Sequence, residues 1–272
     1  AQSRLARPIV VPVPNPSEYG ARTDLFYRER NGRRFLMDVF TPLETPPGGS
    51  PGVIFIHGGP LPESVAAQGK QLGQYQSFGP FVTAGGLAGV VFSHGFSGLD
   101  AFQAARGDVE AAVGYVREHA RELGIDPDRL CLVHVSAGGA FLAPFLASRP
   151  PWLKCVVLYY SLLRPGLMEE LGAGTVDEEQ QATLDPFPFI TPPGATAPAL
   201  LIAEAGRDAA AINADLRRLR DTAIAAGWRV EYWNHPDGPH GFDVSDPSER
   251  SRDILMRTRV FLGEQLRMPS GR

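Results

Sequence analysis

The chain has 272 residues, of which 43% are hydrophobic and 21% are charged, and its formal net charge is −4. These values are ordinary for a globular protein, and so weak an acidic bias gives no reason to expect nucleic acid or an anionic membrane as a partner. No stretch approaches the roughly 20 apolar residues of a membrane span, and Ala1–Val13 lacks the pattern of a signal peptide. We therefore expect a single domain over residues 1–272 that has no membrane span and is cytoplasmic, with export left open because the sequence does not begin with Met.

The two cysteines, Cys131 and Cys155, both lie inside apolar runs. Two cysteines are too few for a disulfide framework, and a free cysteine behaves as a small buried hydrophobic residue. We therefore expect both side chains to be buried without forming a disulfide.

The predicted elements begin with a proline-rich, extended arm over residues 1–20. Two antiparallel strands at 22–30 and 35–41 follow, joined at Asn31-Gly32, a dipeptide typical of hairpin turns. The remaining predicted strands are 53–56, 87–93, 130–135, 155–160, 199–205 and 229–234, and the predicted helices are 74–84, 100–123, 210–226, 248–266 and one between Ser136 and Ala147. This alternation predicts an α/β fold with a mostly parallel sheet of about eight strands and helices on both faces.

Residues 162–197 do not fit this alternation. They lack strand character and include an acidic, Gln-rich stretch, Val176–Gln181. Connections of this length without secondary structure are uncommon in compact domains and are often functional. We therefore expect a small cap over a site.

Ser136 directly follows the strand 130–135, and Ala137, Gly138 and Gly139 come after it. A sharp turn from a strand into a helix exposes one side chain above the sheet and tolerates only small neighbours. The N–H groups at the start of the helix also stabilise nearby negative charge. These features favour a nucleophile at Ser136, although serine is also a common helix N-cap.

A serine nucleophile needs a base to take its proton and a third group to orient that base. His240 lies in a glycine-flanked loop after the strand 229–234, and Asp208 lies just beyond the strand 199–205. Taken singly, His240 could be a surface histidine and Asp208 a helix cap. Reacting groups collect at the carboxyl ends of strands in open α/β sheets, so we expect both side chains to meet Ser136 there.

His57-Gly58-Gly59 is a fourth motif at a strand end. Glycines let backbone N–H groups approach a ligand without interference from a Cβ atom. Acyl transfer needs such donors for the oxyanion of its tetrahedral intermediate. The motif taken alone could also be a flexible turn.

With these motifs, over about residues 22–266, the chain resembles the α/β-hydrolase superfamily. It is most similar to the small carboxylesterases of that superfamily and shares features with its prolyl-oligopeptidase-like and dienelactone-hydrolase-like branches. The order Ser136, Asp208, His240 is the order of nucleophile, acid and histidine in the superfamily.

The resemblance implies a mechanism and a role for each residue. Ser136 would attack the acyl carbonyl, His240 would act as general base and then general acid, and Asp208 would orient His240. The amides of Ala137 and of Gly58 or Gly59 would form the oxyanion hole. The implied reaction passes through an acyl-enzyme intermediate and uses neither an organic cofactor nor a metal, and no His/Asp/Glu set has the spacing of a helical metal site.

The chain departs from the superfamily pattern at two positions. The usual Gly-x-Ser-x-Gly motif reads His134-Val135-Ser136-Ala137-Gly138 here. Alternation along a strand would place His134 on the face of Ser136, so we expect its imidazole to narrow the pocket or to compete for the serine hydroxyl. Pro60 stands where many esterases have a third glycine, and it has no N–H to donate.

The remaining polar residues near the strand ends have weaker signals. His57, His94 and His134 are expected to line the pocket. Glu204, Asp237 and Asp243 are weaker candidates than Asp208 for the acid, because Glu204 lies within a strand and the other two flank His240 closely.

Three functions are compatible with the sequence. The first is a carboxylesterase acting on small to medium acyl esters, with a small-molecule ester as its partner. The second is a peptidase or amidase, suggested by the segment from His57 to Pro60. The third is a degenerate, non-catalytic binding protein, suggested by His134. The sequence does not decide between a monomer and a homodimer.

Overall fold

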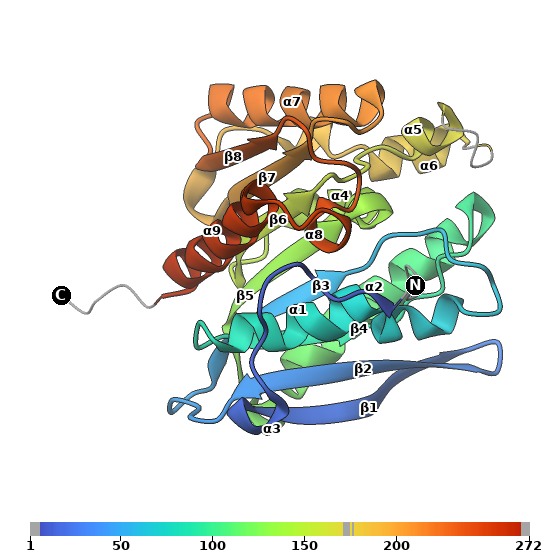
Figure 1. The fold of residues 1–272 in the computed structure, drawn as a ribbon. Helices are drawn as coiled ribbons and strands as arrows, with labels where there is room; N and C mark the ends of the chain where they lie inside the picture. The colour runs from blue at the N-terminus through green and yellow to red at the C-terminus, as the bar shows by residue number, and fades with distance from the viewer. Residues whose placement is uncertain (1–5, 171–174, 176, 268–272) are drawn as a thin grey trace.

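The computed structural model describes residues 6–170, 175 and 177–267. Its centre is an eight-stranded sheet in the order β1-β2-β4-β3-β5-β6-β7-β8 (Figure 1). Strand β2 is antiparallel to β1 and β4, and the other neighbouring strands are parallel, so the predicted mostly parallel sheet is confirmed. The strands are β1(Tyr19–Arg30), β2(Arg33–Pro42), β3(Ser50–Ile56), β4(Ala88–Phe92), β5(Ile125–Val135), β6(Leu153–Tyr159), β7(Ala199–Ala205) and β8(Val230–His235).

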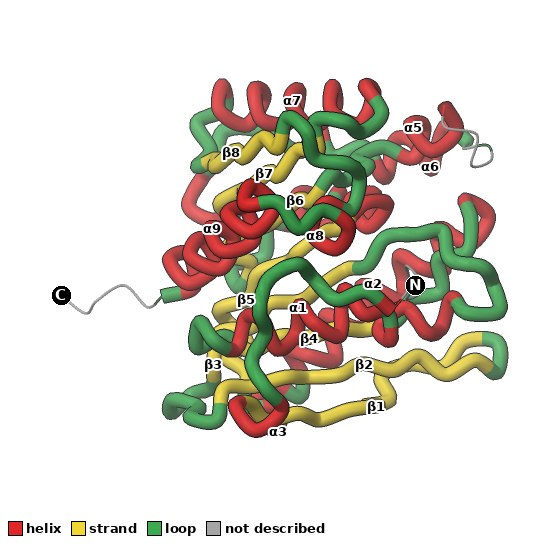
Figure 2. The backbone as a smooth tube through the Cα atoms, in the orientation of Figure 1, coloured by secondary structure: helices red, strands yellow, loops and turns green. Residues whose placement is uncertain are grey.

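Helices cover both faces of the sheet, as the alternation predicts (Figures 1 and 2). Apolar side chains of α1(Gly73–Thr83) and α9(Glu249–Leu266) are buried against one face, and those of α2(Phe102–Glu118) and α7(Ala210–Ala225) against the other. The shorter helices are α3(Ala120–Leu123), α4(Ala143–Ser148), α5(Pro165–Glu170), α6(Glu178–Leu184) and α8(Phe242–Ser245). In the described part of the chain, no helix is long and apolar enough to cross a bilayer.

The central strands are mostly apolar because both of their faces are covered. Every residue of β3, β4 and β7 is buried. Strand β8 lies at the edge of the sheet and is half-buried except at its last residue, His235. Such two-sided burial is characteristic of parallel sheets.

The segment 162–197 contains α5, α6 and two short 3₁₀ turns, Phe187–Phe189 and Gly194–Thr196. Residues 171–174 and 176 of this segment, and with them part of the acidic stretch, lie outside the described residues. Leu167 and Leu184 are fully buried in the same apolar cluster as Leu146 of α4. The segment therefore packs against α4, and its action as a cap stays a prediction.

The N-terminal arm is held along the helices of one face. Ile9 and Val11 are buried, and the Ile9 amide donates to Ser77 Oγ of α1 at 2.9 Å. The Val10 amide donates to the carbonyl of Asp243 in α8 at 2.7 Å. The arm thus contacts the segment that follows His240, while its first five residues lie outside the described residues.

Cys131 and Cys155 are buried as expected, but the expectation that they form no disulfide is wrong. The two residues are paired directly across β5 and β6, with Cα atoms 4.7 Å apart, and their sulfur atoms form a disulfide. The number of cysteines does not reveal strand register, and it is the register that brings these two side chains together.

Three histidines, His57, His94 and His134, lie fully buried in the interior. Burial lowers the pKa of His57 to about 4, although a hydrogen bond to the Gly58 carbonyl opposes the shift. Burial also lowers the pKa of His134 to about 4, opposed by a hydrogen bond to Gly138. Burial and the adjacent His57 hold the pKa of His94 well below its usual value. The folded protein therefore keeps three neutral imidazoles.

This burial predicts a loss of stability in weak acid. An unfolded histidine takes up a proton below about pH 6.5, whereas folded His57 and His134 stay neutral down to about pH 4. The unfolded state binds more protons between these values, so the free energy of unfolding falls by about 1.4 kcal/mol per pH unit for each histidine. Urea unfolding between about pH 7 and about pH 4.5 measures this slope.

Replacing one of the three histidines tests the cause of the slope. His94→Asn should make the pH dependence shallower, because one proton uptake is removed from the unfolded chain. An unchanged slope in this variant would contradict a neutral, buried His94.

Candidate active site

Ser136 lies at the turn that follows β5, where the chain enters a 3₁₀ turn over Ser136–Phe141. Its φ angle is +53°, in the left-handed region that residues other than glycine rarely adopt. The Ser136 carbonyl accepts a hydrogen bond from the Leu162 amide at 2.9 Å. The turn leaves Ser136 partly exposed at the end of β5, and its role as a nucleophile stays a prediction.

Glycines surround the turn because atoms of other residues lie where their side chains would be. A Cβ atom on Gly138 would lie 2.6 Å from the Ile56 carbonyl oxygen, and one on Gly139 would lie 2.5 Å from that of Leu162. A Cβ atom on Gly58 would lie 2.9 Å from the Cβ of Ser136. Any larger residue at these positions would displace the turn.

The structure brings Ser136, His240 and Asp208 into one series of contacts. Ser136 Oγ lies 2.8 Å from Nε2 of His240, and Nδ1 of His240 lies 2.6 Å from Oδ2 of Asp208. The second carboxylate oxygen of Asp208 accepts the Ala209 amide at 2.8 Å. This arrangement suits an imidazole that carries its hydrogen on Nδ1 and can accept the serine proton on Nε2. The His240 side chain is 41% exposed, and that of Asp208 only 6%.

The loops that carry the acid and the histidine are hydrogen-bonded to each other. The Gly206 amide donates to the His235 carbonyl at 2.8 Å, and the Arg207 amide donates to the Gly238 carbonyl at 3.0 Å. A Cβ atom on Gly206 would lie 2.3 Å from the Pro236 carbonyl oxygen, so glycine permits this close approach. The contact holds Asp208 and His240 in register from two neighbouring strands.

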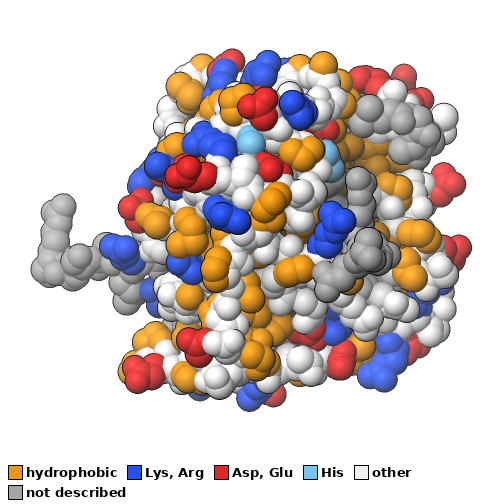
Figure 3. Space-filling model, in the orientation of Figure 1, with side chains coloured by type: hydrophobic (Ala, Val, Ile, Leu, Met, Phe, Trp, Pro, Cys, Tyr) orange, Lys and Arg blue, Asp and Glu red, His pale blue; other side chains and the backbone are white. Residues whose placement is uncertain are grey.

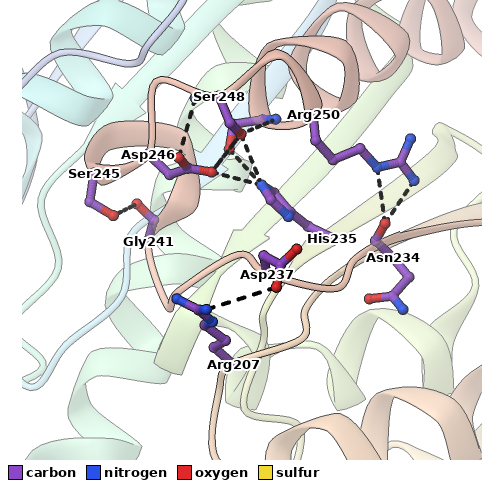
Figure 4. Close-up of polar contacts among 10 residues, drawn as sticks. Arg207, Asn234, His235, Asp237, Gly241, Ser245, Asp246, Ser248 and Arg250 are labelled. Carbon is purple, nitrogen blue, oxygen red and sulfur yellow. Dashed lines mark hydrogen bonds and ion pairs between the residues drawn. The ribbon is translucent and has the colours of Figure 1, made fainter.

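A second polar cluster anchors the far end of the histidine loop (Figure 4). Nε2 of His235 lies 2.7 Å from Asp246, and the hydroxyls of Ser248 and Ser251 donate to the same carboxylate oxygen at 2.6 and 2.7 Å. Burial opposes the charge of Asp246, but the hydrogen bonds from Ser248, Ser251 and His235 lower its pKa to about 2. The loop is thus tied to the end of β8 before His240 and to the start of α9 after it.

The oxyanion motif is held by two hydrogen bonds on Gly58. The Gly58 amide donates to the Tyr75 hydroxyl at 3.0 Å, so of the two glycines predicted as donors it is Gly58 whose N–H already has a partner within the protein. The Gly58 carbonyl lies 2.7 Å from Nδ1 of His57. In a trans peptide the next N–H points opposite to the carbonyl, so this contact orients the Gly59 amide. Gly59 and Ala137 are the candidate donors that the geometry leaves.

The three histidines expected to line the pocket are instead fully buried. The rings of His57 and His94 are stacked with centroids 3.5 Å apart, and Nε2 of His94 lies 3.0 Å from the His57 carbonyl. Nδ1 of His134 lies 2.8 Å from the Gly138 carbonyl, so His134 supports the turn and does not compete for the Ser136 hydroxyl. Alternation misplaced His134 because the strand ends at Val135, and Ser136 already belongs to the turn.

Several residues around the site carry no recognisable sequence signal. Tyr75 holds the Gly58 amide from within α1, where it occupies an ordinary helical position. Tyr160 packs on His240, and Gln74 bonds both Tyr160 and Asp243. Asp243 is not the acid that contacts His240, which leaves that place to Asp208. A helix and a loop distant in sequence have to come together before these contacts exist.

The chain is similar to a known protein family and to solved structures of esterases. Residues 37–149 match the family model described as BD-FAE. No curated protein matches the sequence. Solved structures do match, and three similar ones are a thermostable esterase from Pseudomonas putida, an esterase from Thermogutta terrifontis and a fungal esterase from Rhizomucor miehei.

These three structures are each 18% identical to the chain and cover 93% of it, with TM-scores of 0.70, 0.69 and 0.71 respectively. The matches span 84% of the Pseudomonas protein, 95% of the Thermogutta protein and 84% of the Rhizomucor protein. Likeness at this identity shows the fold over the matched 93% of the chain. The protein therefore has the α/β-hydrolase fold, with its residues 37–149 matching the BD-FAE family.

Proposed function

We propose that this protein is a carboxylesterase-type serine hydrolase that cleaves esters of small to medium acyl chains. The observation that carries the proposal is the series of contacts from Ser136 through His240 to Asp208. The esterase structures that share the fold support it. Acidic and basic side chains are interspersed with hydrophobic ones on the face shown in Figure 3, which favours a small molecule over a nucleic acid as the partner.

The reaction follows from the positions of these groups. His240 Nε2 takes the proton of Ser136 Oγ as that oxygen attacks the acyl carbonyl, and Asp208 stabilises the imidazolium that forms. The amides of Gly59 and Ala137 bind the developing oxyanion. The alcohol leaves with the proton from His240, and water, activated by the same imidazole, then hydrolyses the acyl-enzyme.

A small or medium acyl group suits the short candidate cap. Its described helices are only six and seven residues long, and part of the segment is packed into the core rather than extended over solvent. The exposed His240 imidazole gives water direct access for deacylation.

Replacing the nucleophile tests the proposed function. Ser136→Ala should lower hydrolysis of a chromogenic short-chain ester by about 10⁴-fold or more, because the attacking oxygen is lost. Ser148→Ala is the matched control, since Ser148 is an exposed serine of α4 whose hydroxyl donates to the Pro144 carbonyl of its own helix. A fluorophosphonate probe should label the native protein and the control but not Ser136→Ala.

Equal activity of Ser136→Ala and the native protein would rule out this mechanism. The same assay with a matched anilide separates an esterase from an amidase, because the proposal expects the ester to react faster. Preferential cleavage of the anilide would assign the site to peptide or amide bonds instead.

A second prediction concerns the space beside the nucleophile. Gly58→Ala should lower kcat/KM by about 100-fold, because its Cβ atom would displace Ser136 from His240 by a fraction of an ångström. Gly114→Ala in α2 is the control: a Cβ atom there meets nothing within 4 Å, and alanine favours a helix. Steady-state kinetics of both variants provide the measurement, and near-native kcat/KM in Gly58→Ala would show that the site tolerates the crowding.

A further inference from the structure

Tyr160 has a backbone conformation that a bulky residue rarely adopts. It comes directly after β6, its φ angle is +38°, and it is almost completely buried. A left-handed conformation is unfavourable for a residue with a side chain, and such conformations cluster at functional sites. Among the described residues, Ser136 is also one of the few non-glycine residues with a positive φ angle.

The side chain of Tyr160 lies between His240 and a buried carboxylate. Its ring contacts the His240 imidazole, with ring centroids 4.6 Å apart. Its hydroxyl donates to Oδ1 of Asp243 at 2.5 Å, and Asp243 is fully buried three residues after His240. Burial raises the pKa of Tyr160, so the hydroxyl keeps its proton and acts as the donor.

Gln74 completes the cluster from α1. Its amide nitrogen donates to Oδ2 of Asp243 at 2.6 Å and to the Tyr160 hydroxyl at 3.0 Å. Burial raises the pKa of Asp243, while the hydrogen bonds from Tyr160 and Gln74 favour its charged form. A buried carboxylate without such partners would be costly, so the three side chains hold one another in place.

The segment that begins at Tyr160 also reaches the nucleophile. The Leu162 amide donates to the Ser136 carbonyl at 2.9 Å, and the Ser161 hydroxyl donates to the His134 carbonyl at 2.8 Å. Three consecutive residues therefore contact His240 on one side and the turn at Ser136 on the other. The position of these three residues therefore bears on the distance between Ser136 Oγ and His240 Nε2.

We propose that Tyr160 is a positioning residue, which holds the His240 imidazole within hydrogen-bond distance of Ser136 through its ring and through its hydroxyl contact with Asp243. The need for such a residue follows from the exposure of His240, whose side chain lies on a loop and is 41% open to solvent. Asp208 holds Nδ1 of the imidazole but not its face. This inference rests on the proposed hydrolase function.

The neighbouring Tyr159 supplies a matched control. It is equally buried, and its hydroxyl donates to Thr258 Oγ1 of α9 at 2.7 Å. Tyr159→Phe and Tyr160→Phe each remove one buried phenolic hydroxyl, but only the second removes a contact with the histidine loop. Tyr160→Leu additionally removes the ring that packs on His240.

Steady-state kinetics with a short-chain ester, normalised to active sites titrated with a fluorophosphonate, test the proposal. Tyr160→Phe should lower kcat roughly 10-fold and Tyr160→Leu roughly 100-fold, with KM changed by less than about twofold, because proton transfer is misaligned while the binding surface is kept. Tyr159→Phe should keep kcat within about twofold. The Phe variant at position 160 is thus a partial rescue of the Leu variant.

A double variant tests whether Tyr160 and Asp243 act together. If they do, the double variant Tyr160→Phe with Asp243→Asn should have about the same kcat as the less active of the two single variants. The proposal is overturned if the Tyr160 variants keep kcat within twofold, if Tyr159→Phe lowers kcat as much as Tyr160→Phe, or if only KM changes. The proposed hydrolase function fails separately, through full activity of Ser136→Ala.

Discussion

The left-handed backbone of Ser136 is the constraint on which the other parts of the site depend, because it turns the chain out of β5 and exposes the hydroxyl. Such a conformation costs about 1–2 kcal/mol, which the surrounding structure has to offset. The offset comes from the hydrogen bond of Leu162 to Ser136, the contact of His134 with the Gly138 carbonyl, and close packing around Gly138 and Gly139. Gly58, Gly138 and Gly139 are thus required by the close packing around the turn, whatever part they have in catalysis.

The parallel sheet explains how residues distant in sequence reach Ser136. Strands β5, β7 and β8 run in the same direction, so the loops after them open at the same end of the sheet. Hydrogen bonds between the loops at 206–208 and 235–238 then set the position of Asp208 relative to His240. Buried partners also contact the segments around the site: His57 and Tyr75 bond Gly58, and Asp243 bonds Tyr160, whose ring packs on His240.

Most of the fold could be predicted from the sequence, because apolar runs buried on both faces and the alternation of strands with helices are local patterns. The order Ser136, Asp208, His240 and their places after strands were sufficient to expect that they meet. The direction of His134 could not be predicted, since it depends on the residue at which the strand gives way to the turn. The pairing of Cys131 with Cys155 depends on strand register, and the use of the Gly58 amide depends on a tyrosine in a distant helix. The contact of Tyr160 with His240 could not be predicted either, because in the sequence Tyr160 is the last residue of an apolar run.

The disulfide links β5 and β6 at the same distance from the two strained residues that follow these strands. Cys131 lies five residues before Ser136 on β5, and Cys155 lies five residues before Tyr160 on the neighbouring β6. The disulfide therefore fixes the two strands relative to each other at points that lie equally far, in residues, from Ser136 and from Tyr160. A single inserted residue in either length would rotate one side chain to the opposite face of the sheet while the other kept its place.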